Sequence, residues 1–169
     1  MASAPPPGLR VSRNGPQPGY RPCVGLMLIN PAGLLFIGER RGPVPDAWQM
    51  PQGGIDLGED PRDAARRELR EEVGAERAEL IGESRYWYAY DLPPELLPPR
   101  WGGRYRGQSQ KWFAFRFTGT DQDIDIAAHT PEFLCWRWAQ PDEVLRLAVA
   151  FKRPIYQAVF DEFGALLAA

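Results

Sequence analysis

The stretch from Gly53 to Ala75 constrains the fold and chemistry of this chain more than any other part of the sequence. It opens with two adjacent glycines and closes with a run that carries Glu68, Glu71 and Glu72. Residues three and four positions apart are neighbours on a helix surface, so these glutamates would share one side of a helix. The spacing therefore predicts a helix with a stripe of carboxylates.

We expect this helix to span Pro61 to Val73. Asp60 can accept hydrogen bonds from the free N–H groups of the first turn, and proline suits the first helical position. Gly74 is the conformationally permissive residue that commonly ends a helix. An apolar stripe lies beside the glutamates, so the carboxylates are predicted at the edge of the core. This stripe consists of Ala65, Leu69 and Val73.

The glutamate stripe carries an electrostatic cost unless a cation lies against it. Glu68 and Glu72 are like charges at i and i+4, and such a pair destabilises a helix by roughly 0.2–0.5 kcal/mol. A solvated charged face is the alternative interpretation. Carboxylates without histidine or thiolate favour Mg²⁺, with Mn²⁺ as a substitute, over zinc. Gly53 fits such a metal site, because a residue without a side chain lets its carbonyl approach an ion or a phosphate closely.

The same stretch resembles the Nudix box, the signature of hydrolases that act on nucleoside diphosphates linked to another group. The matching residues are Gly53, Glu59, Arg67, Glu68, Glu71, Glu72 and Gly74. Ala75 departs from the family pattern, which usually has a larger aliphatic residue there. The resemblance implies an α/β protein with the Nudix fold, an α/β/α sandwich around a mixed β-sheet.

Other segments resemble the subgroup that contains bacterial RNA pyrophosphohydrolases and plant-type diadenosine tetraphosphate hydrolases. They are residues 19–22, 47–54, 108–113, 131–133 and 151–156. Two substrates follow from this resemblance. One is 5′-triphosphorylated RNA, converted to 5′-monophosphate RNA at the start of transcript decay, and the other is diadenosine tetraphosphate, cut to ATP and AMP. A nucleotide sensor without catalysis is a more distant alternative. The glutamates of the box are all present, and a site that only binds a nucleotide has no need of a general base.

The resemblance also implies which residues hold metal and act in catalysis. The metal ligands would be the carbonyl of Gly53 and the carboxylates of Glu68, Glu71, Glu72 and Glu132. The catalytic groups are expected among Glu68, Glu72 and Glu132. The general base would be Glu72 or Glu132, and the sequence does not choose between them.

Further residues are expected to support the ligands or to bind substrate. Arg67 can hold a neighbouring glutamate through paired hydrogen bonds. Glu59 would order the loop and the helix start, or contact the metal through water. Three cations align with phosphate-binding positions of the subgroup, namely Arg21, Arg40 and Lys111. Two aromatic residues, Tyr90 and Phe151, could stack on bases, and Lys152 adjoins Phe151.

The bulk properties indicate one compact domain. The chain has 169 residues and a net charge of −2, which argues against broad nucleic-acid binding, so we expect no DNA partner and only local RNA contact. No apolar run approaches the ~20 residues that span a bilayer, and no signal peptide is apparent, which predicts a cytoplasmic protein without a membrane partner. Residues 1–18 are rich in proline and glycine and are expected to form a disordered tail before a domain at 19–165.

The hydrophobic pattern predicts the remaining elements. We expect strands at 24–30, 34–38, 48–51, 79–90, 111–117 and 133–139, and helices at 141–147 and 153–167. The proline- and glycine-rich segment 91–107 should be a surface loop.

Overall fold

The computed structural model describes residues 7–168. Its strands are β1 (Arg10–Ser12), β2 (Arg21–Ile29), β3 (Leu35–Arg40), β4 (Trp48–Gln49), β5 (Gln52–Gly54), β6 (Ala78–Asp91), β7 (Gly107–Phe117) and β8 (Phe133–Ala139). Its α-helices are α1 (Pro61–Glu68), α2 (Pro141–Leu147), α3 (Arg153–Glu162) and α4 (Gly164–Leu167). A π-helical turn, η1 (Leu69–Val73), continues α1, and short 3₁₀ turns are η2 (Pro94–Leu96), η3 (Pro99–Trp101), η4 (Asp121–Asp123) and η5 (Ala150–Lys152).

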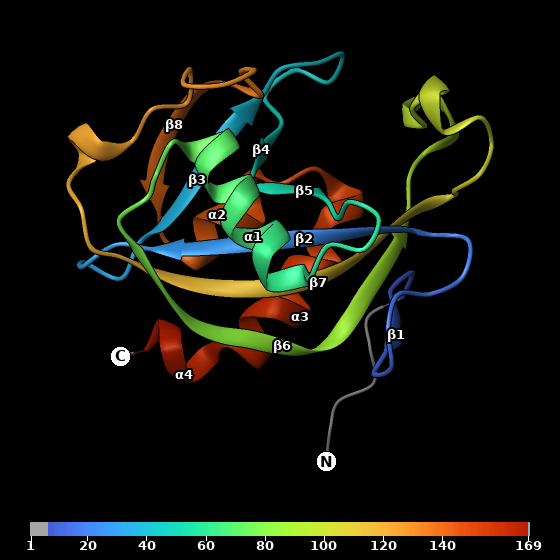
Figure 1. Cartoon of the computed structure of the whole chain (residues 1–169), viewed down its shortest axis with the longest axis horizontal. Coiled ribbons are helices and arrows are strands. Elements are labelled where there is room, and N and C mark those ends of the chain that lie inside the picture. Colours follow the sequence, from blue (N-terminus) through green and yellow to red (C-terminus); the bar gives the residue numbers. More distant parts are fainter. Residues whose placement is uncertain (1–6, 169) are drawn as a thin grey trace.

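The strands form one mixed sheet. Their order is β1-β6-β7-β2-β3-β4, with β5 paired to β2 and β8 paired to β3. The central strands β2 and β7 are parallel, while the other pairs are antiparallel. In Figure 1, α1 crosses in front of β2 and β7, and α2 and α3 lie behind them.

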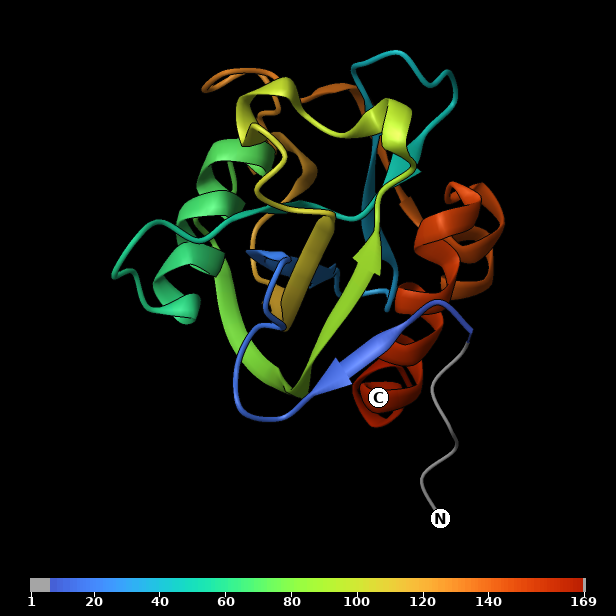
Figure 2. The same ribbon diagram turned by 90° about the vertical axis from the view of Figure 1, so that its right-hand side faces the viewer.

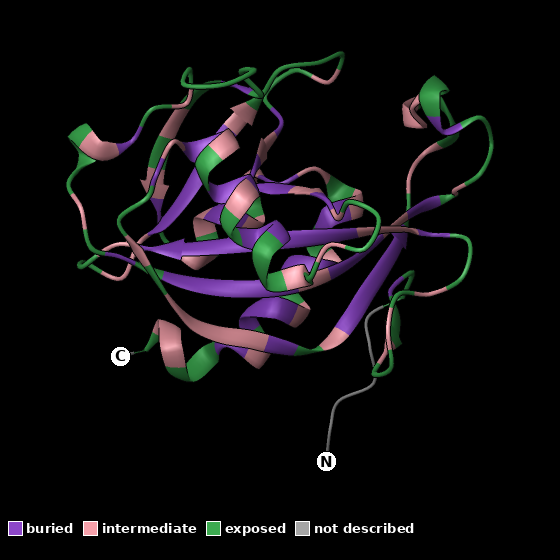
Figure 3. Cartoon of the chain, viewed as in Figure 1, coloured by how far each residue is buried: buried purple, intermediate pink, exposed green. Residues whose placement is uncertain are grey.

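Helices cover both faces of the sheet, as Figure 2 shows with α1 on one side and α2 to α4 on the other. The cause is the alternation of side chains along the buried central strands. On β2, Leu26 and Leu28 pack on the side of α1, whereas Met27 and Ile29 pack with the residues of α3. Both strands are buried over most of their length (Figure 3). The predicted α/β/α sandwich around a mixed sheet is confirmed.

Two elements differ clearly from prediction. Strand β7 begins at Gly107 rather than 111, because its first residues pair with the start of β2. The last predicted helix is divided into α3 and α4 around Phe163, whose backbone leaves the helical conformation before Gly164. The loop predicted at 91–107 is present at 92–106, between β6 and β7, with two 3₁₀ turns in it. None of the helices in residues 7–168 combines the length and apolarity that a bilayer crossing requires.

The N-terminal segment is more ordered than its composition predicts. Residues Arg10–Ser12 form β1, which pairs with β6 and places Arg10 opposite Ala89. Leu9 is buried in the core beside Tyr90. A strand thus lies within the segment that was expected to be disordered, because β6 supplies backbone partners and the core buries Leu9, neither of which a local pattern reveals. Residues 1–6 of that tail lie outside the described part of the chain.

Candidate active site

Two glycines allow side chains from other elements to pack against the backbone of β5. A β-carbon on Gly53 would overlap the carboxylate of Glu68. A β-carbon on Gly54 would overlap the guanidinium of Arg21. Glycine at both positions permits this close approach.

The predicted helix is present with the predicted ends. The carboxylate of Asp60 accepts a hydrogen bond from the N–H of Arg62 at 2.8 Å, and Gly74 ends the helix with a φ of 70°. The last turn differs, because Leu69–Val73 is π-helical. Such turns are frequent at functional sites. The change of helix type falls between Glu68 and Glu71, within the glutamate stripe.

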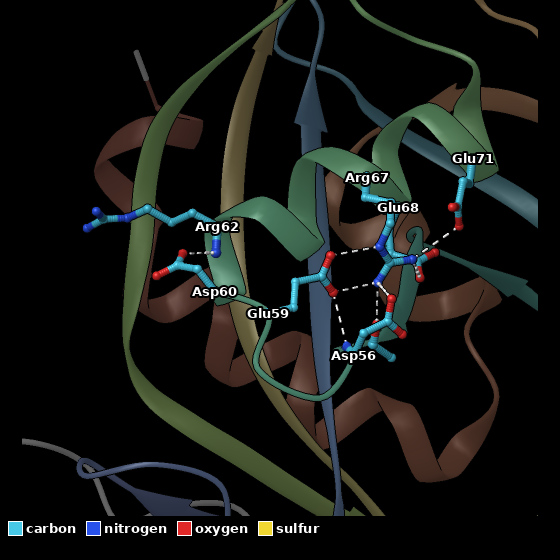
Figure 4. Close-up of polar contacts among 8 residues, drawn as sticks. Asp56, Glu59, Asp60, Arg62, Arg67, Glu68 and Glu71 are labelled. Carbon is cyan, nitrogen blue, oxygen red and sulfur yellow. Dashed lines mark hydrogen bonds and ion pairs between the residues drawn. The ribbon is translucent and has the colours of Figure 1, made fainter.

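Arg67 joins the loop, the helix and two of the glutamates. Its guanidinium pairs with both carboxylate oxygens of Glu59, from Nε at 2.9 Å and Nη2 at 2.8 Å. Nη1 donates to Glu68 at 2.9 Å and to Glu71 at 3.2 Å, and Nη2 donates to the carbonyl of Gly54 at 2.8 Å. Figure 4 shows these contacts converging on one guanidinium. Because all five N–H groups are used, Arg67 fixes the orientation of the surrounding carboxylates.

Glu59 is held between Arg67 and the loop. The N–H of Asp56 donates to its Oε1 at 3.0 Å. The hydrogen bonds from Arg67 lower the pKa of Glu59 to about 2, against the opposing effect of burial. A permanently ionised Glu59 therefore ties the loop to the helix, which is the ordering role expected from the sequence.

Glu68 and Glu72 are buried carboxylates, each 8% exposed. Burial raises the pKa of Glu68 to about 7. Burial and the nearby charge of Glu68 raise the pKa of Glu72 well above its ordinary value, although the N–H of Gln52 donates to its Oε2 at 3.1 Å. Desolvated carboxylates of like charge are a donor set that a divalent cation would stabilise.

The carboxylates do not form a closed set of ligands. Within residues 7–168, no three carboxylate, imidazole or thiol groups are grouped closely enough to hold a metal ion. Arg67 occupies an oxygen of Glu68 and of Glu71, and Gln52 occupies an oxygen of Glu72. All three residues border a common cavity, and their carboxylate chemistry fits a divalent cation.

The cavity has a volume of about 700 Å³ and lies between β5, the helix α1–η1 and the loops at 41–44, 92–101 and 129–132. It brings together most of the residues that the sequence assigned to metal or substrate. They are Arg21, Arg40, Gly53, Glu68, Glu71, Glu72, Tyr90, Glu132, Phe151 and Lys152. Glu132 is exposed and reaches the cavity from the loop before β8.

Aromatic and basic groups line the same cavity. Tyr90 and Phe151 stack with ring centroids 6.0 Å apart, and Tyr90 is the more deeply buried of the two. Lys152 is buried and donates a hydrogen bond to Gln49. Burial, followed by the charge of Arg40, lowers the pKa of Lys152 to about 7. The half-buried Phe151 is thus the ring available to a ligand, while Tyr90 supports it from behind.

Lys111 lies outside this cavity, contrary to the predicted phosphate contact. Its Nζ is 3.5 Å from a carboxylate oxygen of Glu83 and 6.0 Å from the ring centre of Trp87. Neighbouring residues of a strand point to opposite faces, so Lys111 points away from the face that carries Gln108 and Gln110.

Gln108 and Trp101 are among the cavity-wall residues to which the sequence analysis assigned no role. Gln108, Gln110 and Trp112 recur with the period of a strand, which is a signal that they share one face of β7. The guanidinium of Arg21 lies 5.9 Å from the ring centre of Trp101. No local pattern in the loop at 92–106 indicates this contact.

Comparisons with known proteins agree with this geometry. The chain is 55% identical over 152 residues to an RNA pyrophosphohydrolase of Cereibacter sphaeroides, covering 88% of this chain and 93% of the relative. It is 57% identical over 145 residues to an RNA pyrophosphohydrolase of Rhodospirillum rubrum, covering 86% and 87%.

A solved structure of a C. elegans Ap4A hydrolase has the same fold, with a TM-score of 0.61 at 19% identity over 86% of this chain and 98% of that chain. The model of the NUDIX domain family matches residues 19–159. The chain therefore belongs to the Nudix hydrolase family.

Proposed function

We propose that the chain is a pyrophosphohydrolase that converts 5′-triphosphorylated RNA to 5′-monophosphate RNA. The observation that carries this proposal is the identity of 55–57% to RNA pyrophosphohydrolases over nearly the whole domain. The cavity supports it, since carboxylates, basic side chains and an accessible aromatic ring line it together. Because transcripts are the substrate in this proposal, we expect the enzyme to act in the cytoplasm.

Nudix hydrolases generally need a divalent metal, and we propose Mg²⁺ with Mn²⁺ as a substitute. The residues that would hold it are Gly53, through its carbonyl, and Glu68, Glu71, Glu72 and Glu132. A bound cation of this kind neutralises phosphate oxygens and lowers the pKa of a coordinated water. Arg67 would keep Glu68 and Glu71 in position throughout.

The other residues of the cavity would orient the substrate. Arg21, Arg40 and the protonated form of Lys152 provide positive charge on its wall and suit the phosphates of an RNA 5′ end. Phe151 suits the first bases, because a partly exposed ring can stack on a base without reading its identity.

The proton of the attacking water would pass to Glu72 or Glu132. Both line the same cavity, Glu72 from the buried helix turn and Glu132 from an exposed loop. A carboxylate within reach of the water can act as a general base. Comparing the pH–rate profiles of Glu72→Gln and Glu132→Gln would identify which of the two titrates in turnover.

A parallel assay tests the proposal. Purified enzyme is given triphosphorylated RNA or diadenosine tetraphosphate, with Mg²⁺ or with a chelator, and products are separated chromatographically. We expect Mg²⁺-dependent formation of 5′-monophosphate RNA with a larger kcat/KM than for diadenosine tetraphosphate. A larger kcat/KM for the dinucleotide would refute the RNA assignment, and lack of turnover on both would favour a binding protein.

A further inference from the structure

Three glutamine side chains connect a tryptophan in the core to the wall of the cavity. Trp112 is fully buried, and its Nε1–H donates to Oε1 of Gln110 at 3.1 Å. Nε2 of Gln110 donates to Oε1 of Gln52 at 3.1 Å. Nε2 of Gln52 in turn donates to Oε1 of Gln108 at 3.2 Å. The last amide of this chain, that of Gln108, borders the cavity.

The tryptophan gives this chain of amides a direction. An indole N–H can only donate, so Gln110 must turn its oxygen toward Trp112 and its nitrogen toward Gln52. The same requirement then passes to Gln52, whose nitrogen is left to donate to Gln108. Turning any one amide around would place two donors or two acceptors against each other in a buried site, where unpaired polar groups are costly.

The side-chain oxygen of Gln108, Oε1, is consequently turned toward the other glutamines and away from the cavity. It accepts from Gln52, from Nε2 of Gln110 at 2.8 Å and from the hydroxyl of Tyr90 at 3.1 Å. Its own Nε2 donates to no group within residues 7–168, and the side chain is only partly buried. Gln108 therefore presents its N–H donor to the cavity, while its acceptor oxygen is occupied by the groups behind it.

We infer that Trp112, acting through Gln110 and Gln52, orients Gln108 as a donor to a phosphate oxygen of the substrate. This inference rests on the proposed polyphosphate substrate. A phosphate oxygen is favoured over a base because Gln52, which holds Gln108, also holds Glu72 through its backbone N–H. The donor is thus connected through one residue, Gln52, to Glu72 of the carboxylate cluster near which the phosphates would bind, although Gln108 also contacts Tyr90. Gln108 contacts substrate, and Trp112 is a positioning residue.

Two substitutions at Gln108 separate this role from a structural one. Gln108→Glu keeps an oxygen for the three inner donors but replaces the displayed N–H by a negatively charged oxygen. Gln108→Met removes the displayed N–H and also leaves the inner donors without an acceptor. The glutamate variant should therefore be the more stable protein with the weaker binding to phosphate, whereas the methionine variant should be less stable with the smaller loss of binding.

The binding probe is inorganic tripolyphosphate, titrated calorimetrically with Ca²⁺ in place of Mg²⁺ to slow hydrolysis, and guanosine is the probe for base contact. We expect the Kd of tripolyphosphate to rise about tenfold for Gln108→Met and about a hundredfold for Gln108→Glu. The Kd of guanosine should not change. Unchanged tripolyphosphate binding by Gln108→Glu, or a loss confined to guanosine, would overturn the inference.

The orientation of the Gln108 side-chain amide tests the role of Trp112. In protein with ¹⁵N-labelled glutamine, the side-chain signal of Gln108 should be single in the wild type and exchange-broadened in Trp112→Phe. If two orientations become equally populated, the Kd of tripolyphosphate doubles. Adding Trp112→Phe to Gln108→Met should cause no further loss of binding, because both act through one donor. An additive loss would assign Trp112 a packing role only. RNA turnover by the wild type, measured in parallel, tests the proposed function independently of the Kd values of the variants.

Discussion

Replacing Glu68 by glutamine should stabilise the metal-free protein at high pH while abolishing most of its activity. The folded-state pKa of Glu68 is raised from 4.5 to about 7, chiefly by burial. A folded-state pKa above the unfolded value means that the folded protein binds this proton more tightly. The group therefore does not oppose folding below about pH 4.5, and opposes it increasingly as the pH rises toward 7.

The size of this effect follows from the shift. A rise from 4.5 to about 7 corresponds to about 3 kcal/mol at pH values above 7. A glutamine side chain in this position would keep an oxygen for Arg67 but carries no proton to lose, so Glu68→Gln removes the penalty. For a protein of this size, about 3 kcal/mol is a rise of roughly 10 °C in Tm at pH 8, with little difference near pH 4.

Thermal unfolding from pH 4 to 8 in the presence of a chelator measures this difference directly. Excess Mg²⁺ should narrow it, since metal binding stabilises the wild type more than a variant that lacks one ligand. Turnover of triphosphorylated RNA should fall by about two to four orders of magnitude. A Tm difference that does not change with pH, or a variant less stable than the wild type at pH 8, would refute the electrostatic reasoning.

Three further tests, with five substitutions between them, address other parts of the structure. Arg67→Lys keeps the charge, but an ammonium group cannot donate two parallel hydrogen bonds to the carboxylate of Glu59. The value of kcat/KM should therefore fall about 10- to 100-fold, and near-normal kinetics would contradict the role of Arg67. Lys111→Ala should change the KM for RNA less than twofold while Arg40→Ala raises it about tenfold, and the reverse order would restore Lys111 to the site. Leu9→Ala should lower the free energy of unfolding by about 2–5 kcal/mol in denaturant titration, because Leu9 is only 7% exposed. Val11→Ala nearby should cost little, because Val11 is 38% exposed. Equal, negligible losses for both variants would support a disordered tail.

The ends of the α1–η1 helix could be predicted because capping is a local interaction. Asp60 and Gly74 act on residues within one turn of themselves, and both occupy the expected positions. The π-helical turn could not be predicted in this way. Its last residue, Val73, accepts a hydrogen bond from the N–H of Asp125 at 2.9 Å, and a β-carbon on Gly74 would overlap the carbonyl of Asp125. Contacts at such a separation in sequence are absent from any local pattern.

The box residues and the substrate residues differ in how far the sequence could place them. Helical spacing alone puts Glu68 and Glu72 on one side, and the structure places both at the cavity. To place Lys111 in the same way, one must know which face of its strand points toward the cavity. A shift of the strand register by one residue moves every side chain to the opposite face. The parallel pairing of β7 with β2 sets that face, so Gln108 enters the cavity wall and Lys111 does not.

Strand β1 shows why composition is a weak guide at the edge of a sheet. Three residues are too few to carry a periodic signal, and the proline- and glycine-rich surroundings favour disorder in isolation. The long strand β6 supplies what the segment lacks, namely backbone partners at Trp87, Tyr88 and Ala89 and an apolar pocket for Leu9. In return, β1 covers part of the outer edge of β6, an edge that would otherwise invite pairing with another chain. The folded unit consequently begins before residue 19, where the family match begins, so a chain truncated at that residue should unfold at a lower temperature and aggregate more readily.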